Sequence, residues 1–290
     1  MIARSRRPLW LAVLLLLCAQ AMPVSAATPP GVKVMHDVAY GPAKLQTMDI
    51  YLPPQPKGAP IILMVHGGAW AFGDKTNPQV YENKVARWVP LGFIFVSIDY
   101  PMVPDSDPVQ QADDVARAMA FAQKTASTWG GDPDRLILMG HSAGAHLVSL
   151  LNADPTRATK LGAKPWLGTV SLDSGALDVP AIMEHEHFQL YDKAFGSDPA
   201  LWKAASPIDH LTKDSPPWLG VCNSGRPASC GPNKIYAAKA QSLGLTVEVL
   251  PEPMRHSEIN RELGKSSGYT DAVEGFMASL DPAVNALLRQ

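Results

Sequence analysis

The pentapeptide Gly140-His141-Ser142-Ala143-Gly144 places a serine between two glycines. It follows the apolar run Leu136 to Met139, typical of a buried strand, and precedes the apolar stretch Ala145 to Leu151, typical of a helix. A sharp turn from strand to helix strains the backbone at the serine, and flanking glycines relieve the crowding. The turn also sets Ser142 at a helix N-terminus, where the dipole favours developing negative charge. We therefore predict that Ser142 is a nucleophile for acyl transfer.

A second glycine turn, His66-Gly67-Gly68-Ala69-Trp70, directly follows the apolar run Ile61 to Val65. Acyl transfer needs N–H donors aimed at the oxyanion that develops on the attacked carbonyl, and each is typically worth ~3 kcal/mol. Glycines let the backbone approach a substrate without an intervening Cβ atom. We expect donors from the amides of Gly68 and Ala69, with a third from Ala143, the residue after the nucleophile.

A nucleophilic serine needs a base, and the order of such residues along the chain places a histidine last. His256 lies in a short loop after the predicted strand Thr246 to Leu250, so we assign it as the base. His210, at the end of the segment 179–210, is the rival, but it precedes the Pro216-Pro217 entry to the next strand. His146 lies one turn along the helix after Ser142, so packing is its expected role.

Strands alternate with helical patterns along the rest of the chain, which predicts an α/β fold with a mostly parallel central sheet and helices on both faces. The first strands precede any crossover helix and are expected to be antiparallel. Further strands are predicted at Leu45 to Leu52, Phe93 to Ile98, Trp166 to Leu172 and Trp218 to Cys222. Helices are predicted at Gln110 to Ser127, Asn233 to Leu243 and Tyr269 to Leu280.

The segment 179–210 interrupts this pattern and is rich in aromatic and histidine side chains. A long connection at the carboxyl end of a strand is a common place for a lid or a substrate wall, although a plain surface excursion is the alternative. We expect Trp70, Phe72, His141 and the aromatics of this segment to contact substrate. His185 and His187 lie among glutamates, and we interpret them as solvated side chains, so no metal or other cofactor is predicted.

Composition is that of an ordinary globular protein, with 46% hydrophobic and 18% charged residues and a formal net charge of −2. No run of lysine and arginine follows the first ten residues, so we predict no nucleic-acid partner. Arg4, Arg6 and Arg7 precede an apolar stretch, and Val24-Ser25-Ala26 offers small residues for cleavage. This pattern predicts a signal peptide over 1–26, a single domain over 27–290 and a periplasmic or secreted protein without an integral membrane segment.

Two of the three cysteines, Cys222 and Cys230, lie outside the predicted signal peptide. An even pair in an oxidising compartment predicts a disulfide, here closing a tight loop from Asn223 to Ser229. Two free buried thiols are the alternative. Metal binding is not expected, because zinc sites need about four ligands.

Together these motifs resemble the α/β-hydrolase esterases, near the bacterial feruloyl-esterase-like and kynurenine-formamidase-like enzymes and the hormone-sensitive-lipase-like group. The resemblance covers about residues 45–280. It implies hydrolysis of carboxylic esters, or less often amides, without a cofactor. The sequences that carry it are HGGAW at 66–70, Gly73-Asp74-Lys75, Asp99-Tyr100, GHSAG at 140–144, Ala205-Ser206-Pro207 and Pro216-Pro217.

The chain departs from that family at the acid that orients the histidine. The family usually places it after the strand equivalent to Trp218 to Cys222, yet residues 215–247 contain no Asp or Glu. Asp173 at the end of the preceding strand is our first candidate, Asp178 the second and Glu252 the third. A Ser–His pair oriented by a backbone carbonyl or by Asn223 is a further alternative.

The sequence therefore predicts a serine hydrolase that cleaves small carboxylic esters through an acyl-enzyme intermediate. An amidase or peptidase on the same fold is the first alternative. A binding protein that has lost the catalytic acid is the second.

Overall fold

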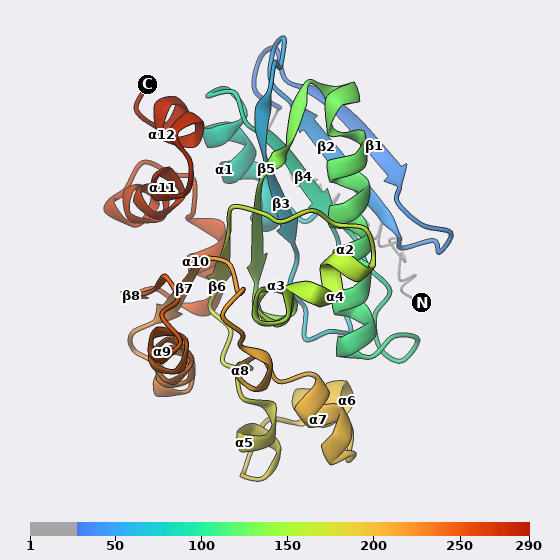
Figure 1. Cartoon of the computed structure of the whole chain (residues 1–290), viewed down its shortest axis with the longest axis vertical. Coiled ribbons are helices and arrows are strands. Elements are labelled where there is room, and N and C mark those ends of the chain that lie inside the picture. The colour runs from blue at the N-terminus through green and yellow to red at the C-terminus, as the bar shows by residue number, and fades with distance from the viewer. Residues whose placement is uncertain (1–27) are drawn as a thin grey trace, which may run out of the picture.

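An eight-stranded, mostly parallel sheet forms the centre of the computed structural model, which describes residues 28–290 (Figure 1). The predicted signal peptide lies outside the described residues. The spatial order is β1-β2-β4-β3-β5-β6-β7-β8. The strands are β1 (Lys33–Ala39), β2 (Thr47–Leu52), β3 (Ala59–Val65), β4 (Ile94–Ile98), β5 (Gly131–His141), β6 (Gly168–Leu172), β7 (Trp218–Asn223) and β8 (Val247–Glu252).

The pairing confirms the predicted mixture of strand directions. β1 pairs with β2 and β2 with β4 in antiparallel fashion, whereas every pairing from β4 through β3 to β8 is parallel. All seven residues of β3 are buried, as expected for a strand covered on both faces. Alternate β3 side chains enter different cores, Leu63 on one face and Met64 on the other.

Helices cover both faces of the sheet (Figure 1). α2 and α3 share one core with alternate residues of β3, and α1, α10, α11 and α12 share the other. The helices are α1 (Pro78–Trp88), α2 (Pro108–Thr125), the 3₁₀ turn η1 (Ala126–Trp129), α3 (Ala143–Ala153), α4 (Pro155–Lys160), α5 (Val179–Met183), α6 (Gln189–Phe195), α7 (Pro199–Ala204), α8 (Pro207–His210), α9 (Pro227–Ser242), α10 (His256–Arg261), α11 (Gly268–Leu280) and α12 (Pro282–Leu288).

The start of α9 corrects the sequence prediction. The helix begins at Pro227 rather than Asn233, because proline fits the first turn of a helix, where its missing N–H has no partner. Cys230 therefore lies in the first turn of α9 and not at the end of a loop. The predicted disulfide between Cys222 and Cys230 is confirmed.

The segment 179–210 folds into the short helices α5 to α8, at the bottom of Figure 1. It is fastened to the body of the domain at two points. The ring of His146 in α3 donates from Nε2 to the carbonyl of Ala205 at 2.7 Å, and Lys239 Nζ in α9 donates to the carbonyl of Ile208 at 2.6 Å. Phe195 of α6 packs edge-on against Trp70 at a centroid distance of 4.8 Å.

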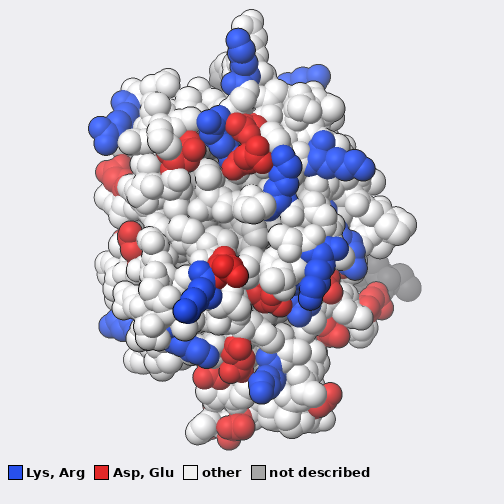
Figure 2. Space-filling model, viewed as in Figure 1, with Lys and Arg blue, Asp and Glu red and all other residues white. Residues whose placement is uncertain are grey.

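Charged side chains of both signs are interspersed on the face drawn in Figure 2. None of the helices within residues 28–290 combines the length and the apolar character needed to cross a membrane.

Candidate active site

Ser142 occupies the sharp turn between β5 and α3. Its backbone has φ 57° and ψ −116°, a left-handed conformation that strains any residue with a Cβ atom. Its glycine neighbours are required by space. A Cβ on Gly140 would overlap the carbonyl of Gly144, and one on Gly144 would overlap that of Val65. The turn thus requires glycine two residues before and two residues after the serine.

A chain of hydrogen bonds joins Ser142, His256 and Asp173. His256 begins α10, and its Nε2 lies 2.9 Å from Ser142 Oγ. Its Nδ1 lies 2.6 Å from Asp173 Oδ2. Asp173 directly follows β6, and Ser142 lies in the turn after the adjacent strand β5, whereas His256 follows the loop after β8 at the same edge of the sheet. This arrangement suits an imidazole with its proton on Nδ1, which leaves Nε2 free to accept the serine proton.

The carboxylate of Asp173 is fully buried and accepts three further hydrogen bonds. Oδ1 accepts the backbone N–H of Asn223 at 3.0 Å and the hydroxyl of Ser229, and Oδ2 accepts Arg226 Nη2 at 3.0 Å. Burial alone would raise the pKa of Asp173. The hydrogen bonds from His256, Ser229 and Asn223, with the charge of Arg226, outweigh burial and hold that pKa well below its usual range.

The other candidate acids lie elsewhere. Asp178 caps α5 by accepting the amide of Ala181 at 3.1 Å. Glu252 ends β8, and burial raises its pKa rather than lowering it. Asn223 contributes its backbone N–H to Asp173, not a side chain to the histidine.

The remaining histidines have other partners. His146 is fully buried, accepts the indole N–H of Trp70 and donates to a carbonyl. His210 bonds to the carbonyls of Lys203 and Ala204. His187 pairs with Asp192 on the surface. Among residues 28–290, no group of three or more His, Cys, Asp or Glu side chains is arranged to hold a metal ion.

The turn after β3 lies against the serine turn. A Cβ on Gly67 would come within 2.8 Å of Ser142 Cβ and of the His141 carbonyl. Gly68, Ala69 and Trp70 all have positive φ, and a Cβ on Gly68 would overlap the backbone of Phe72. Ala69 and Ala143 both line the cavity at Ser142.

A cavity of about 510 Å³ opens above Ser142 and His256. Its walls come from the β3 turn, from α5 and α6, and from the start of α9. The residues that line it include Ala69, Trp70, Ala143, Ala176, Ile182, His185, Glu186, His187, Phe188, Leu190, Tyr191, Arg226, Ala228 and Pro232.

Four of the expected substrate contacts need correction. Trp202 is absent from the cavity lining, and its indole N–H donates to the carbonyl of Gly196 at 3.0 Å. His141 does not line this cavity; its ring is buried and donates from Nε2 to the backbone carbonyl of His256 at 3.0 Å. Phe72 is 70% exposed and also lies outside the cavity lining. Phe195 is turned inward against Trp70. The walls contain Trp70, Phe188 and Tyr191, as expected.

Sequence reasoning did not identify Lys84, which supports the helix that carries His256. Lys84 in α1 is fully buried, and its Nζ donates to the carbonyl and the side-chain oxygen of Asn260 in α10 at 2.6 and 2.9 Å. Burial lowers the pKa of Lys84 to about 7. The only sequence signal is a lysine on the apolar face of a helix.

Two buried histidines predict a loss of stability in mild acid. Burial, with the charge of His256, lowers the pKa of His141 to about 3, and burial lowers that of His146 to about 4. Unfolding returns each to about 6.5. Below pH 6.5 these histidines are therefore protonated in the unfolded chain but stay neutral in the folded chain. The free energy of unfolding falls with pH until the pKa of each histidine in the folded chain is reached. We expect the free energy of unfolding at pH 5 to be lower than at pH 7.5 by about 2 kcal/mol for each histidine.

Urea unfolding at the two pH values measures this difference. The variant His141→Gln should show about half of the wild-type drop. Equal free energies for the wild type at pH 5 and pH 7.5 would contradict the assignment of both rings as neutral.

Comparison with known proteins finds that the chain is similar to several esterases. The model of the BD-FAE family matches residues 48–165. Esterase LipQ of Mycobacterium tuberculosis is 34% identical over 199 residues, which cover 63% of this chain and 47% of LipQ. Isoprenylcysteine alpha-carbonyl methylesterase ICME of Arabidopsis thaliana is 26% identical over 245 residues, covering 75% and 55%. The chain thus spans about half the length of the curated relatives it matches.

Solved structures agree on the fold. Esterase B from Lactobacillus rhamnosis, in a structure with a C4-C4 SN3 tributyrin phosphonate, superimposes with a TM-score of 0.69 at 19% identity. The match covers 91% of this chain and 88% of that chain.

Proposed function

We propose that this chain, which resembles the α/β-hydrolase esterases, hydrolyses carboxylic esters with Ser142 as nucleophile, His256 as base and Asp173 as the orienting acid. The observation that carries the proposal is the unbroken hydrogen-bond chain from Ser142 Oγ through His256 to Asp173. The relatives named as esterases support the same reaction class.

The reaction proceeds in two balanced steps. His256 Nε2 takes the hydroxyl proton as Ser142 Oγ attacks the ester carbonyl, and the imidazolium gives that proton to the departing alcohol oxygen. The product is an acyl-enzyme. A water molecule then attacks the acyl carbon, His256 takes a proton from it, and the acid leaves as the proton returns to Ser142.

The developing oxyanion is stabilised by the backbone amides of Gly68, Ala69 and Ala143. The glycine turn that carries two of them is pressed against the serine turn, so these donors are in place before substrate binds. The start of α3 adds the favourable end of its dipole at Ala143.

The substrate is a small ester with an apolar group. The cavity walls at Ile182, Phe188, Leu190 and Tyr191 offer apolar surface, while His185, Glu186 and Arg226 place polar groups at the same cavity. Esters with an aromatic or short aliphatic part fit this mixture.

Covalent labelling tests the proposal. A fluorophosphonate probe should modify purified protein, peptide mass spectrometry should place the phosphonyl group on Ser142, and p-nitrophenyl acetate should turn over. Aminoacyl anilides serve as the matched amide substrates. A label on another residue, or anilide turnover that exceeds ester turnover, would replace this proposal by the amidase alternative or by another site. Neither labelling nor turnover would favour a binding protein.

We also propose that the protein works in the periplasm or outside the cell. The confirmed disulfide supports this, because disulfides persist in oxidising compartments. Mass spectrometry of the exported protein from a bacterial host should find a chain that begins near Ala27. An intact N-terminus retained in the cytoplasm would refute it.

A further inference from the structure

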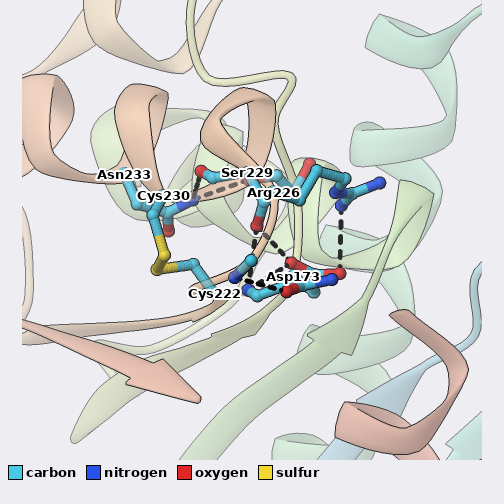
Figure 3. The surroundings of a disulfide bond; sticks show 9 residues. Asp173, Cys222, Arg226, Ser229, Cys230 and Asn233 are labelled. Atoms are coloured by element: carbon cyan, nitrogen blue, oxygen red, sulfur yellow. Dashed lines mark hydrogen bonds and ion pairs between the residues drawn. A yellow bond between two sulfur atoms is a disulfide. The ribbon is translucent and has the colours of Figure 1, made fainter. Parts of the chain in front are cut away.

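The segment from Cys222 to Cys230 supplies most of the hydrogen bonds that Asp173 accepts (Figure 3). Within the described residues, the Asp173 carboxylate accepts from four groups. His256 is one of them, and the other three are the Asn223 amide, the Arg226 guanidinium and the Ser229 hydroxyl. All three lie between the two cysteines of the disulfide. This is the stretch that holds no acidic residue of its own.

The disulfide and two close contacts hold this segment against Asp173. The bond joins Cys222 in β7 to Cys230 in the first turn of α9, and both cysteines are buried. Asn233 in α9 donates from Nδ2 to the carbonyls of Ser174 and Ser229 at 2.8 Å each, which ties α9 to the residue after Asp173. A Cβ on Gly175 would overlap the carbonyl of Ala228, so the two backbones lie in direct contact.

The three donors from this segment fix the orientation of the Asp173 carboxylate toward His256. Ser229 and Asn223 both bond to Oδ1, and Ser229 Oγ also accepts the Asn223 amide at 3.1 Å, so the three groups form a closed cluster. Arg226 and His256 share Oδ2. A carboxylate held at both oxygens cannot rotate away from the imidazole without breaking bonds to a charged group, each worth about 1.5–3 kcal/mol.

We propose that Arg226 and Ser229, held in place by the Cys222–Cys230 disulfide, are positioning residues that fix the Asp173 carboxylate toward His256. The inference rests on the proposed function, because it concerns the same Ser142 site. Neither residue reacts. Each acts on catalysis through Asp173, and the disulfide keeps both at the correct distance.

Arg226 also lines the substrate cavity, so its variants must separate positioning from substrate contact. We expect Arg226→Met and Ser229→Ala each to lower kcat by about 10- to 100-fold with little change in KM. Arg226→Lys, which keeps the charge, should recover part of the loss.

The decisive measurement repeats both substitutions in an Asp173→Asn background. If the two residues act through the carboxylate, neither should lower kcat further there. Ser242→Ala, on the exposed end of α9, and Arg289→Met, on the C-terminal helix, are matched controls that should retain wild-type kcat. Unchanged kcat in the Arg226 and Ser229 variants, or undiminished effects in the Asp173→Asn background, would overturn the inference.

The disulfide gives an independent arm. Dithiothreitol supplies two electrons and two protons, converts Cys222 and Cys230 to thiols and is itself oxidised to its cyclic disulfide. Reduced wild type and the double variant Cys222→Ala/Cys230→Ala should show the same loss of kcat. Neither reduction nor the double substitution should lower kcat further in the Asp173→Asn background. Circular dichroism confirms that each sample is folded. Full kcat in folded, reduced protein would show that the bond does not position the acid.

Wild type and Ser142→Ala are assayed in parallel with every variant. If wild type turns over p-nitrophenyl acetate and Ser142→Ala does not, the proposed function stands, and a flat response of the variants refutes only the positioning role. If wild type does not turn over, the proposed function fails and the inference fails with it.

Discussion

Replacing Asp173 with asparagine should lower kcat for ester hydrolysis by about 10⁴-fold. Asparagine has nearly the same shape, so the hydrogen bonds that Asn223 and Ser229 donate to Oδ1 can keep its side chain in place. Its amide N–H, however, would face His256 Nδ1 as a donor. The imidazole proton would then move to Nε2, which could no longer accept the proton of Ser142.

Steady-state kinetics with p-nitrophenyl acetate measures this loss. Asp178→Asn and Glu252→Gln are the matched controls, because each neutralises one of the other two candidate acids. Asn still caps α5 at position 178, so both controls should stay within a few-fold of wild type. A severe loss of kcat in either control, with near-normal kcat in Asp173→Asn, would show that the orienting acid is not Asp173.

Replacing Ser142 with alanine should abolish phosphonate labelling and lower kcat by about 10⁶-fold. The substitution removes one oxygen atom and keeps the Cβ, so the strained turn at φ 57° is unchanged. The remaining backbone amides and the cavity can still bind the ester, so we expect a residual rate above that in water.

Thermal unfolding monitored by circular dichroism shows whether Ser142→Ala is folded like wild type. A folded variant that keeps more than a few per cent of the ester turnover would exclude Ser142 as the nucleophile. Because the strain of the turn is unchanged, any change in Tm reports the loss of the contact between Ser142 Oγ and His256.

The strands of the sheet could be predicted because each is a short apolar run with turn residues around it. β1 and α1 could not. β1 is an edge strand with no fully buried residue and an irregular register between Met35 and Val38, so it lacks a clear apolar alternation. α1 presents Lys84 to the interior among Val80, Val85 and Trp88, which breaks the apolar pattern of a helix face.

Ser142 and His256 could be proposed from the sequence because a local motif surrounds the serine and the order of such residues along the chain places the histidine. For the acid, the sequence offers only an order of candidates, because no motif surrounds Asp173 and its contact with His256 depends on how β6 and β7 align. The donors on Asp173 were not identifiable at all. Arg226 and Ser229 reach it across 53 and 56 residues of sequence, through the pairing of Leu172 with Val221.

The position of Asp173 also matters for surveys of protein families. Neighbouring parallel strands lie about 4.8 Å apart, so a carboxylate at the end of β6 can reach the same imidazole as one at the end of β7. A census of degenerate family members that inspects only the customary column of an alignment would find no acid here and would record this chain as a pseudoenzyme. A survey should therefore search the end of the neighbouring strand for an acidic residue before it classes a chain as inactive.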